Sequence, residues 1–215
     1  YKLVEESKRI PKTSQPSPHQ FVEFYRKIAQ KGDTILSIHI TAKLSGTYAS
    51  AVSAAEELKG EFNVIPIDSA VGSLGIGLLC REARKMERAG KSVDEIVKYI
   101  ENTKSKIRVI LTLDTLEYAK MSGRVKALQA ALASVLNVKP IAVLSDGVLN
   151  MAERVRTRKA ALERVLAMGK EEFGDKPVYL GIVHARDLKS GQALLEDAKS
   201  HFNAKETMIS ELAIS

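Results

Sequence analysis

The chain has 215 residues, of which 45% are hydrophobic and 27% charged, so it suits one large or two small globular domains rather than a disordered or fibrous protein. It has one cysteine, Cys80, no apolar run long enough to cross a membrane and no signal-peptide pattern, which excludes an internal disulfide framework and predicts a cytoplasmic protein. The formal net charge is +7, but acids alternate with the basic residues along the predicted helices and no basic block carries interleaved aromatics, which argues against nucleic-acid binding.

The first half of the chain predicts an α/β layer with a parallel sheet. Ser17 and Gln20 hold the positions of a capping box, and the helix that follows is expected to bury a stripe of Phe21, Phe24, Tyr25 and Ile28. After it we expect a strand over 34–40, a helix from Thr47 and a strand over 62–67, with Tyr48, Val52 and Ala55 on one face of the helix. Two further helices follow, one over 74–89 and one from the Ser92 capping box through Ile100. Cys80 is expected to be buried in the first of these two helices or to lie at its boundary. Strands that alternate with helices are typical of a parallel sheet.

The second half mixes antiparallel and crossover elements. The expected elements are a strand over 107–113, helices over 114–123 and 126–136, a hairpin turning at Asp146-Gly147, a helix over 158–173, a strand over 178–184, a helix over 188–202 and a strand over 207–212. We place the domain boundary near Ser105, which gives a parallel-sheet N-terminal domain over 1–105 and a mixed α/β C-terminal domain over 106–215.

Three hydroxyl-rich segments lead into helices: KTSQPSP at 12–18, TAKLSGTY at 41–48 and DSAVGSLG at 68–75. The carboxyl ends of parallel strands gather at one edge of a sheet, where ligands usually bind. Amides at helix N-termini favour an anion there, and serine or threonine hydroxyls can donate to the same anion. The segments therefore predict a carboxylate or phosphate site, and the alternative is that each hydroxyl only caps its own helix.

Arg154, Arg156 and Arg158 alternate, so they would face one side if the hairpin strand continued that far. Such a row suits an anion, although it could equally be an exposed basic strand edge. Enzyme signatures are weaker. Ser45 has no G-x-S-x-G motif around it, His39 sits inside an apolar strand as core histidines do, and the other histidines lack metal-ligand spacing.

Six motifs occur together in a familiar order: PKTSQPSP, LSGTYASA, IDSAVGSLGIG, LEYAKMSGRV, LNVKPI followed by Asp146-Gly147, and RVRTRKA. In this order the chain resembles the DegV family of bacterial fatty-acid-binding proteins along nearly its whole length. The resemblance implies two α/β domains with a long-chain fatty acid between them, its acyl chain in an apolar tunnel and its carboxylate held by hydroxyls and an arginine. It implies no cofactor and no metal.

The resemblance also implies which residues bind the carboxylate. They are Thr13, Ser14, Ser45, Gly46 and Arg156, with Arg154 and Arg158 as alternatives to Arg156. Family members usually begin with a strand ending in Thr-Asp-Ser and end with a Thr-His-x-Gly-Pro-Gly stretch. Neither is found here, so the chain is expected to be truncated at both ends.

Some family members present the bound fatty acid to a separate ATP-dependent kinase, which makes an acyl-phosphate for phospholipid synthesis. The resemblance therefore predicts a non-enzymatic acyl carrier with a kinase subunit as partner. The alternatives are a serine-dependent acyl hydrolase and a basic regulatory or nucleic-acid-binding protein.

Overall fold

The structure is a computed structural model that describes residue 6 and residues 13–114 and 138–212. It contains two compact units. The first unit comprises Thr13–Ile107 together with Ser145–Val148, and the second comprises the described residues of Arg108–Leu144 and Leu149–Ser215. The sequence-based division into domains at Ser105 stays a prediction, because compactness alone does not show that either part folds independently.

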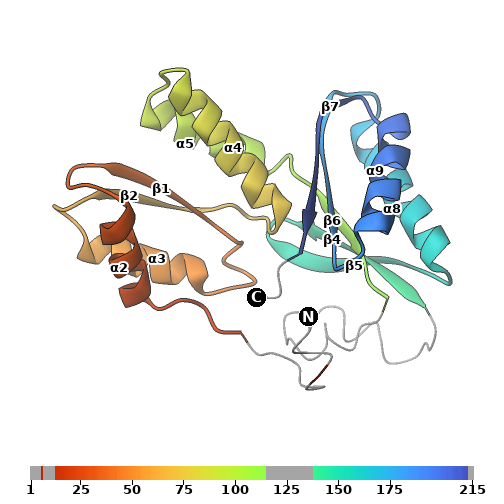
Figure 1. Cartoon of the computed structure of the whole chain (residues 1–215), viewed down its shortest axis with the longest axis horizontal. Helices are drawn as coiled ribbons and strands as arrows, with labels where there is room; N and C mark the ends of the chain where they lie inside the picture. Colours follow the sequence, from red (N-terminus) through yellow and green to blue (C-terminus); the bar gives the residue numbers. More distant parts are fainter. Residues whose placement is uncertain (1–5, 7–12, 115–137, 213–215) are drawn as a thin grey trace. The chain divides into compact units, whose positions relative to one another are not determined.

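The first unit is a parallel strand pair covered by helices. Its elements are α2 (Pro18–Ile28), β1 (Thr34–His39), α3 (Thr47–Glu57), β2 (Asn63–Asp68), α4 (Leu74–Arg88) and α5 (Val93–Lys104). β1 and β2 pair in parallel, from Thr34 opposite Asn63 to His39 opposite Asp68. In Figure 1, α2 and α3 lie on one side of this pair and α4 and α5 on the other. The predicted order and the parallel pairing are confirmed, and both strands end at the same edge.

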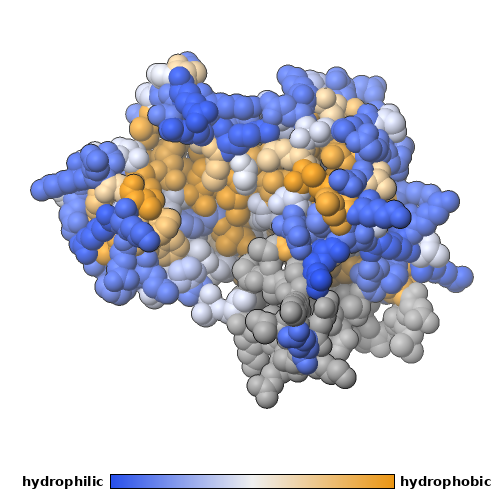
Figure 2. Space-filling model, in the orientation of Figure 1, coloured by the Kyte–Doolittle hydropathy of each residue, from blue (hydrophilic) through white to orange (hydrophobic). Residues whose placement is uncertain are grey.

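The α2 helix begins as expected but buries a different face. Ser17 Oγ accepts from the Gln20 amide at 3.3 Å, and Gln20 Oε1 accepts from the Ser17 amide at 2.8 Å, which confirms the capping box. The predicted apolar stripe is partly wrong, because Phe24 is 54% and Ile28 57% exposed. Phe24 lies about 100° and Ile28 about 60° around the helix from Tyr25, both on the side away from Val22, and the buried face with Val22 and Tyr25 packs against α3. Figure 2 shows the resulting apolar surface over α2.

The α3 and α4 helices also differ from expectation in which side chains they bury. α3 buries small residues, Ser50, Ala51 and Ala54, because these let the helix approach α2 and β2 closely. Val52, which the apolar pattern groups on one face with Tyr48 and Ala55, is 36% exposed, so this face is not the buried one. In α4 the inner face holds Leu79, so Cys80, the next residue around the helix, is exposed.

The second unit has a mixed α/β architecture, as predicted. Its elements are β3 (Val109–Thr112), β4 (Lys139–Ser145), β5 (Val148–Val155), α8 (Arg158–Phe173), β6 (Val178–His184), α9 (Leu188–His201) and β7 (Ala204–Glu211). β3 and β4 are antiparallel, with β5 beyond β4, whereas β6 and β7 are parallel. α8 and α9 lie side by side next to the β6–β7 pair (Figure 1). The helices predicted over 114–123 and 126–136 fall almost entirely outside the described residues.

The turn between β4 and β5 is the two-residue hairpin turn that Asp146-Gly147 predicts. Both residues have positive φ, +50° for Asp146 and +76° for Gly147. This left-handed pair matches the twist of the two strands. Across the described ranges, no helix is both long enough and apolar enough to cross a membrane.

The start of α5 shows how one capping box depends on pH. Ser92 Oγ accepts from the Glu95 amide, and Glu95 accepts from the Ser92 amide and from Lys91 Nζ, each at 2.9 Å. The Lys91 ammonium and the hydrogen bonds from Ser92 lower the pKa of the Glu95 carboxyl to about 2.

We expect Glu95→Gln to lower the urea midpoint of unfolding at pH 7 and to change it little at pH 2. The pKa of Glu95 is lower in the folded than in the unfolded chain, so its ionised form stabilises the fold above about pH 4.5, and this stabilisation is lost as the pH falls toward 2. Urea titrations of parent and variant at both pH values measure the difference. Equal losses at the two pH values would contradict the assignment.

Candidate functional site

Three polar joints meet in the first unit, and we name them by position: joint 1 (residues 13–17), joint 2 (residues 41–48, after β1) and joint 3 (residues 68–75, after β2). The parallel pairing of β1 with β2 brings joints 2 and 3 to one edge of the sheet. The Asp68 carboxylate connects them, because its Oδ1 accepts from the Ala42 amide at 3.3 Å and from the Ala70 amide at 2.9 Å. The Thr41 amide also donates to the Val71 carbonyl at 2.9 Å.

Joint 1 reaches joint 2 through Gln15. The Gln15 amide occupies the space that a β-carbon on Gly46 would fill, and its Nε2 donates to Ser50 Oγ at 3.3 Å. Thr13 and Ser14, which directly precede Gln15, are exposed. All three hydroxyl-rich joints are therefore connected within one compact unit.

The helices that joints 2 and 3 open both lack a side-chain hydrogen bond from their N-cap residue. Gly46 is the N-cap of α3 and offers no side chain, whereas α2, α5, α8 and α9 are each capped by the side chain of the residue before them. Ser45 Oγ bonds Thr47 Oγ1 at 2.7 Å and accepts from the Thr47 amide at 3.3 Å. Ser45 thus satisfies the amide of the first residue of α3, while no N-cap side chain covers the positive end of the α3 dipole, which favours an anion.

Two buried hydroxyls of the joints serve the fold. Thr41 is 1% exposed, and its Oγ1 donates to the Gly147 carbonyl at 3.1 Å, in the hairpin turn that belongs to the same unit. Lys43 Nζ donates to the Asp146 carbonyl of that turn at 2.8 Å. Ser69 is fully buried, and its hydroxyl bonds the backbone of Val71. Among the predicted ligand residues, Ser45 is half-buried and Thr13 and Ser14 are exposed, so their hydroxyls are not sealed in the core; Tyr48 and Ser73 of the joints are not buried either.

His39 is a core histidine, as predicted. It is 8% exposed, and its Nε2 lies 2.7 Å from Ser37 Oγ, which in turn lies 2.6 Å from the Tyr25 hydroxyl. Burial lowers the pKa of the His39 imidazole. The imidazole therefore bonds Ser37 and not Ser45, so the structure gives Ser45 no histidine base from β1.

The predicted row of three arginines is wrong for Arg158. β5 ends at Val155, so Arg154 lies in the strand, Arg156 follows it and Arg158 is the first residue of α8. A helical turn follows the 3.6-residue period, so Arg158 leaves the face that alternation in a strand would give it. Arg156 is exposed and makes no ion pair with the part of the chain that the structure describes. Its place beside the three joints stays a prediction, because it belongs to the second unit.

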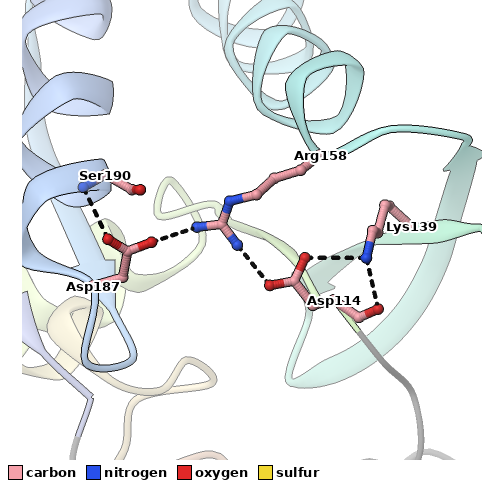
Figure 3. Close-up of polar contacts among 5 residues, drawn as sticks. All are labelled: Asp114, Lys139, Arg158, Asp187 and Ser190. Atoms are coloured by element: carbon pink, nitrogen blue, oxygen red, sulfur yellow. Dashed lines mark hydrogen bonds and ion pairs between the residues drawn. The ribbon is translucent and has the colours of Figure 1, made fainter.

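Arg158 is bound between two carboxylates, as Figure 3 shows. Its guanidinium donates to Asp114 at 2.7 Å and to Asp187 at 3.0 Å. Lys139 Nζ lies 3.2 Å from the same Asp114 carboxylate, and hydrogen bonds from Ser190 together with the charge of Arg158 lower the pKa of Asp187. This cluster joins the starts of α8 and α9 to the end of β3, so we assign Arg158 a structural role.

Sequence reasoning missed Gln15 and Asp68 as connecting residues. Gln15 lies inside the TSQPS motif, and Asp68 follows the β2 core directly, but their partners are distant along the chain. Within residues 13–114 and 138–212, no group of three or more histidine, cysteine, aspartate or glutamate side chains is placed to hold a metal ion.

Comparison with known proteins decides the family. Residues 1–214 match the model of the family described as "Uncharacterised protein, DegV family". The chain belongs to the DegV family. A DegV domain-containing protein of Listeria monocytogenes is 30% identical over 204 residues, covering 94% of this chain and 72% of its own length. One from Deinococcus radiodurans is 39% identical over 184 residues, covering 84% of this chain and 65% of its own length.

Solved DegV structures share the fold. A fatty-acid-binding DegV family protein from Thermus thermophilus superposes with a TM-score of 0.88 at 31% identity, covering 98% of this chain and 76% of that one. DegV of Bacillus subtilis, a fatty acid binding protein, gives 0.84 at 27% identity, covering 97% and 75%. These matches confirm the α/β fold and the family inferred from the motifs. They also show that the chain spans only part of the length of its DegV relatives.

Proposed function

We propose that this protein binds a long-chain fatty acid and holds its carboxylate at the open N-terminus of α3. The observation that carries the proposal is the uncapped start of α3, at the edge where all three polar joints meet. Fatty-acid binding by DegV proteins that share this fold supports it. A carboxylate is one of the anions that hydroxyls and helix amides can hold without a metal or a catalytic side chain.

The proposed ligands of the carboxylate divide into three kinds. Thr13, Ser14 and Ser45 supply hydroxyl donors, Gly46 supplies the backbone at the start of α3, and Arg156 supplies the cation. A charge-assisted hydrogen bond contributes about 1.5–3 kcal/mol, so a few such contacts are enough to select an acid over a neutral lipid.

Calorimetric titration with oleate and with oleyl alcohol tests binding and head-group selection together. The two ligands share the acyl chain length, so an apolar tunnel alone would bind both alike. We expect the protein to bind oleate at least tenfold more tightly than the alcohol. Equal affinities would contradict the carboxylate site, and labelling of Ser45 by a fluorophosphonate probe would favour the hydrolase alternative.

We further propose that the protein is a carrier that presents the carboxylate to a partner kinase for phospholipid synthesis in the cytoplasm. In that step a carboxylate oxygen attacks the γ-phosphorus of ATP, ADP leaves and an acyl-phosphate forms. The proposal rests on the family resemblance and on a site built from donors without a general base.

Hydroxylamine trapping tests the carrier role, because it converts an acyl-phosphate to a stable hydroxamate. Radiolabelled oleate would be incubated with ATP, Mg²⁺ and the kinase subunit of a DegV-containing bacterium. We expect hydroxamate only when this protein is added. Product at the same rate without this protein, or with this protein and no kinase, would contradict the role of carrier.

A further inference from the structure

Gly46 leaves room for a neighbouring side chain, and its own backbone does not call for glycine. Its φ of −73° and ψ of 2° are values that any L-residue can adopt. The three atoms nearest to a β-carbon built on Gly46 all belong to the Gln15 amide, with Nε2 at 2.6 Å. An alanine at position 46 would therefore have to displace Gln15.

The Gln15 amide is also anchored on α3. Its Nε2 donates to Ser50 Oγ at 3.3 Å, and Ser50 is only 4% exposed. Ser50 lies one turn after Gly46, and its amide donates to the Gly46 carbonyl at 3.0 Å. Gln15 thus contacts both the N-cap residue of α3, Gly46, and a buried residue of the same helix, Ser50.

Joint 1 is held at two points. Ser17 fixes its C-terminal end through the capping box of α2, and Gln15 fixes its middle on α3. Thr13 and Ser14 come directly before Gln15, so the position of their hydroxyls relative to the α3 N-terminus depends on where the Gln15 side chain sits.

We propose that Gln15 is the positioning residue of the carboxylate site: by filling the space above Gly46 and bonding Ser50, it sets Thr13 and Ser14 beside the N-terminus of α3. Gln15 acts through these hydroxyls and does not itself bind the ligand. The inference rests on the proposed fatty-acid function.

Four variants test this role: Gln15→Met, Gln15→Ala, Gly46→Ala and the double variant Gln15→Ala/Gly46→Ala. Methionine keeps the length of the side chain but lacks the amide donor. We expect Gln15→Met and Gly46→Ala each to weaken oleate binding by about fivefold to tenfold, the effect of one lost hydrogen bond. Oleyl alcohol affinity should change by less than about twofold, because the alcohol brings no charge to the site.

The double variant tests the contact between the two residues. Without the Gln15 amide the space above Gly46 is empty, so Gly46→Ala should cost less than about twofold in the Gln15→Ala background. Gly77→Ala is the matched control, because its nearest contact is an ordinary 3.6 Å from Leu74, and it should leave oleate affinity unchanged.

Circular dichroism and melting of each variant establish that the fold is retained. Additive losses in the double variant, or equal losses for oleate and oleyl alcohol, would contradict the role of Gln15. Failure of the parent to bind oleate would contradict the proposed function and this role with it. A parent that binds oleate while all the variants keep its affinity would contradict the role of Gln15 alone.

Discussion

Arg156→Ala is expected to weaken oleate binding by tenfold to a hundredfold, and Ser14→Ala by a similar factor. In the proposed site each would remove one hydrogen bond to the charged carboxylate, worth about 1.5–3 kcal/mol, and every 1.4 kcal/mol is about tenfold in affinity. Both side chains are exposed in the structure, so their loss should leave the fold intact. Calorimetric titration of parent and variants measures the effect.

Two controls accompany this prediction: titration of the same proteins with oleyl alcohol, and the variant Arg158→Ala. Affinity for the alcohol should hardly change in Arg156→Ala, because the alcohol offers no charge for the guanidinium to meet. Arg158→Ala removes an arginine only two residues away, but that arginine pairs with Asp114 and Asp187, so it should lower the melting temperature and leave the preference for acid over alcohol unchanged. If acid and alcohol lose affinity equally in Arg156→Ala, this arginine does not bind the carboxylate.

Gly147→Ala should destabilise the protein by at least about 2 kcal/mol. The φ of +76° costs an alanine about 1–2 kcal/mol, and its β-carbon would collide with Thr41 Oγ1, which adds a further overpacking cost of about 1–3 kcal/mol. A change of this size lowers the melting temperature by several degrees in a chain of about 200 residues. Thermal unfolding followed by circular dichroism measures it.

Gly90 provides a matched control, because its φ is also +76° and nothing lies within 4 Å of the position of an added β-carbon. Gly90→Ala should therefore show the backbone cost alone. The extra loss in Gly147→Ala should shrink in the Thr41→Ala background, where the colliding atom is gone. Equal destabilisation by the two glycine substitutions would mean that the contact between Thr41 and Gly147 is unimportant.

Local signals in the sequence predicted the element order well. The capping boxes of Ser17 and Ser92 and the Asp146-Gly147 turn depend on neighbours within three residues, so their geometry can be read along the chain. The bounds of α8 and β6 agree with the predicted ranges for the same reason.

The buried face of a helix was harder to predict, because an apolar repeat fits almost as well when the helix is turned by one residue about its axis. Phe24 fits the apolar helical repeat of α2 as well as Val22 does. Val22 lies in the core because it is on the side of α2 that packs against α3. Alanine-rich α3 carries little contrast between its faces, so the pattern that groups Tyr48, Val52 and Ala55 does not reveal that the opposite residues are the buried ones.

Contacts between segments that are distant along the chain could not be predicted from the sequence. Arg158 is separated from Asp114 by 44 residues and from Asp187 by 29, and no local pattern marks these partners. The contact between Gln15 and Ser50 spans 35 residues. The sequence nevertheless indicated the candidate site, because hydroxyls repeated after successive strands signal an edge that the parallel sheet assembles.

Mass spectrometry of lipid extracted from the purified protein tests the central claim most directly. The protein would be purified without added lipid, and its organic extract compared with that of the Arg156→Ala variant and of an unrelated protein purified in the same way. We predict a long-chain fatty acid at close to one molecule per chain in the parent and much less in the variant. A parent extract with no fatty acid above the level of the unrelated protein, together with no uptake of added oleate, would contradict the proposed function.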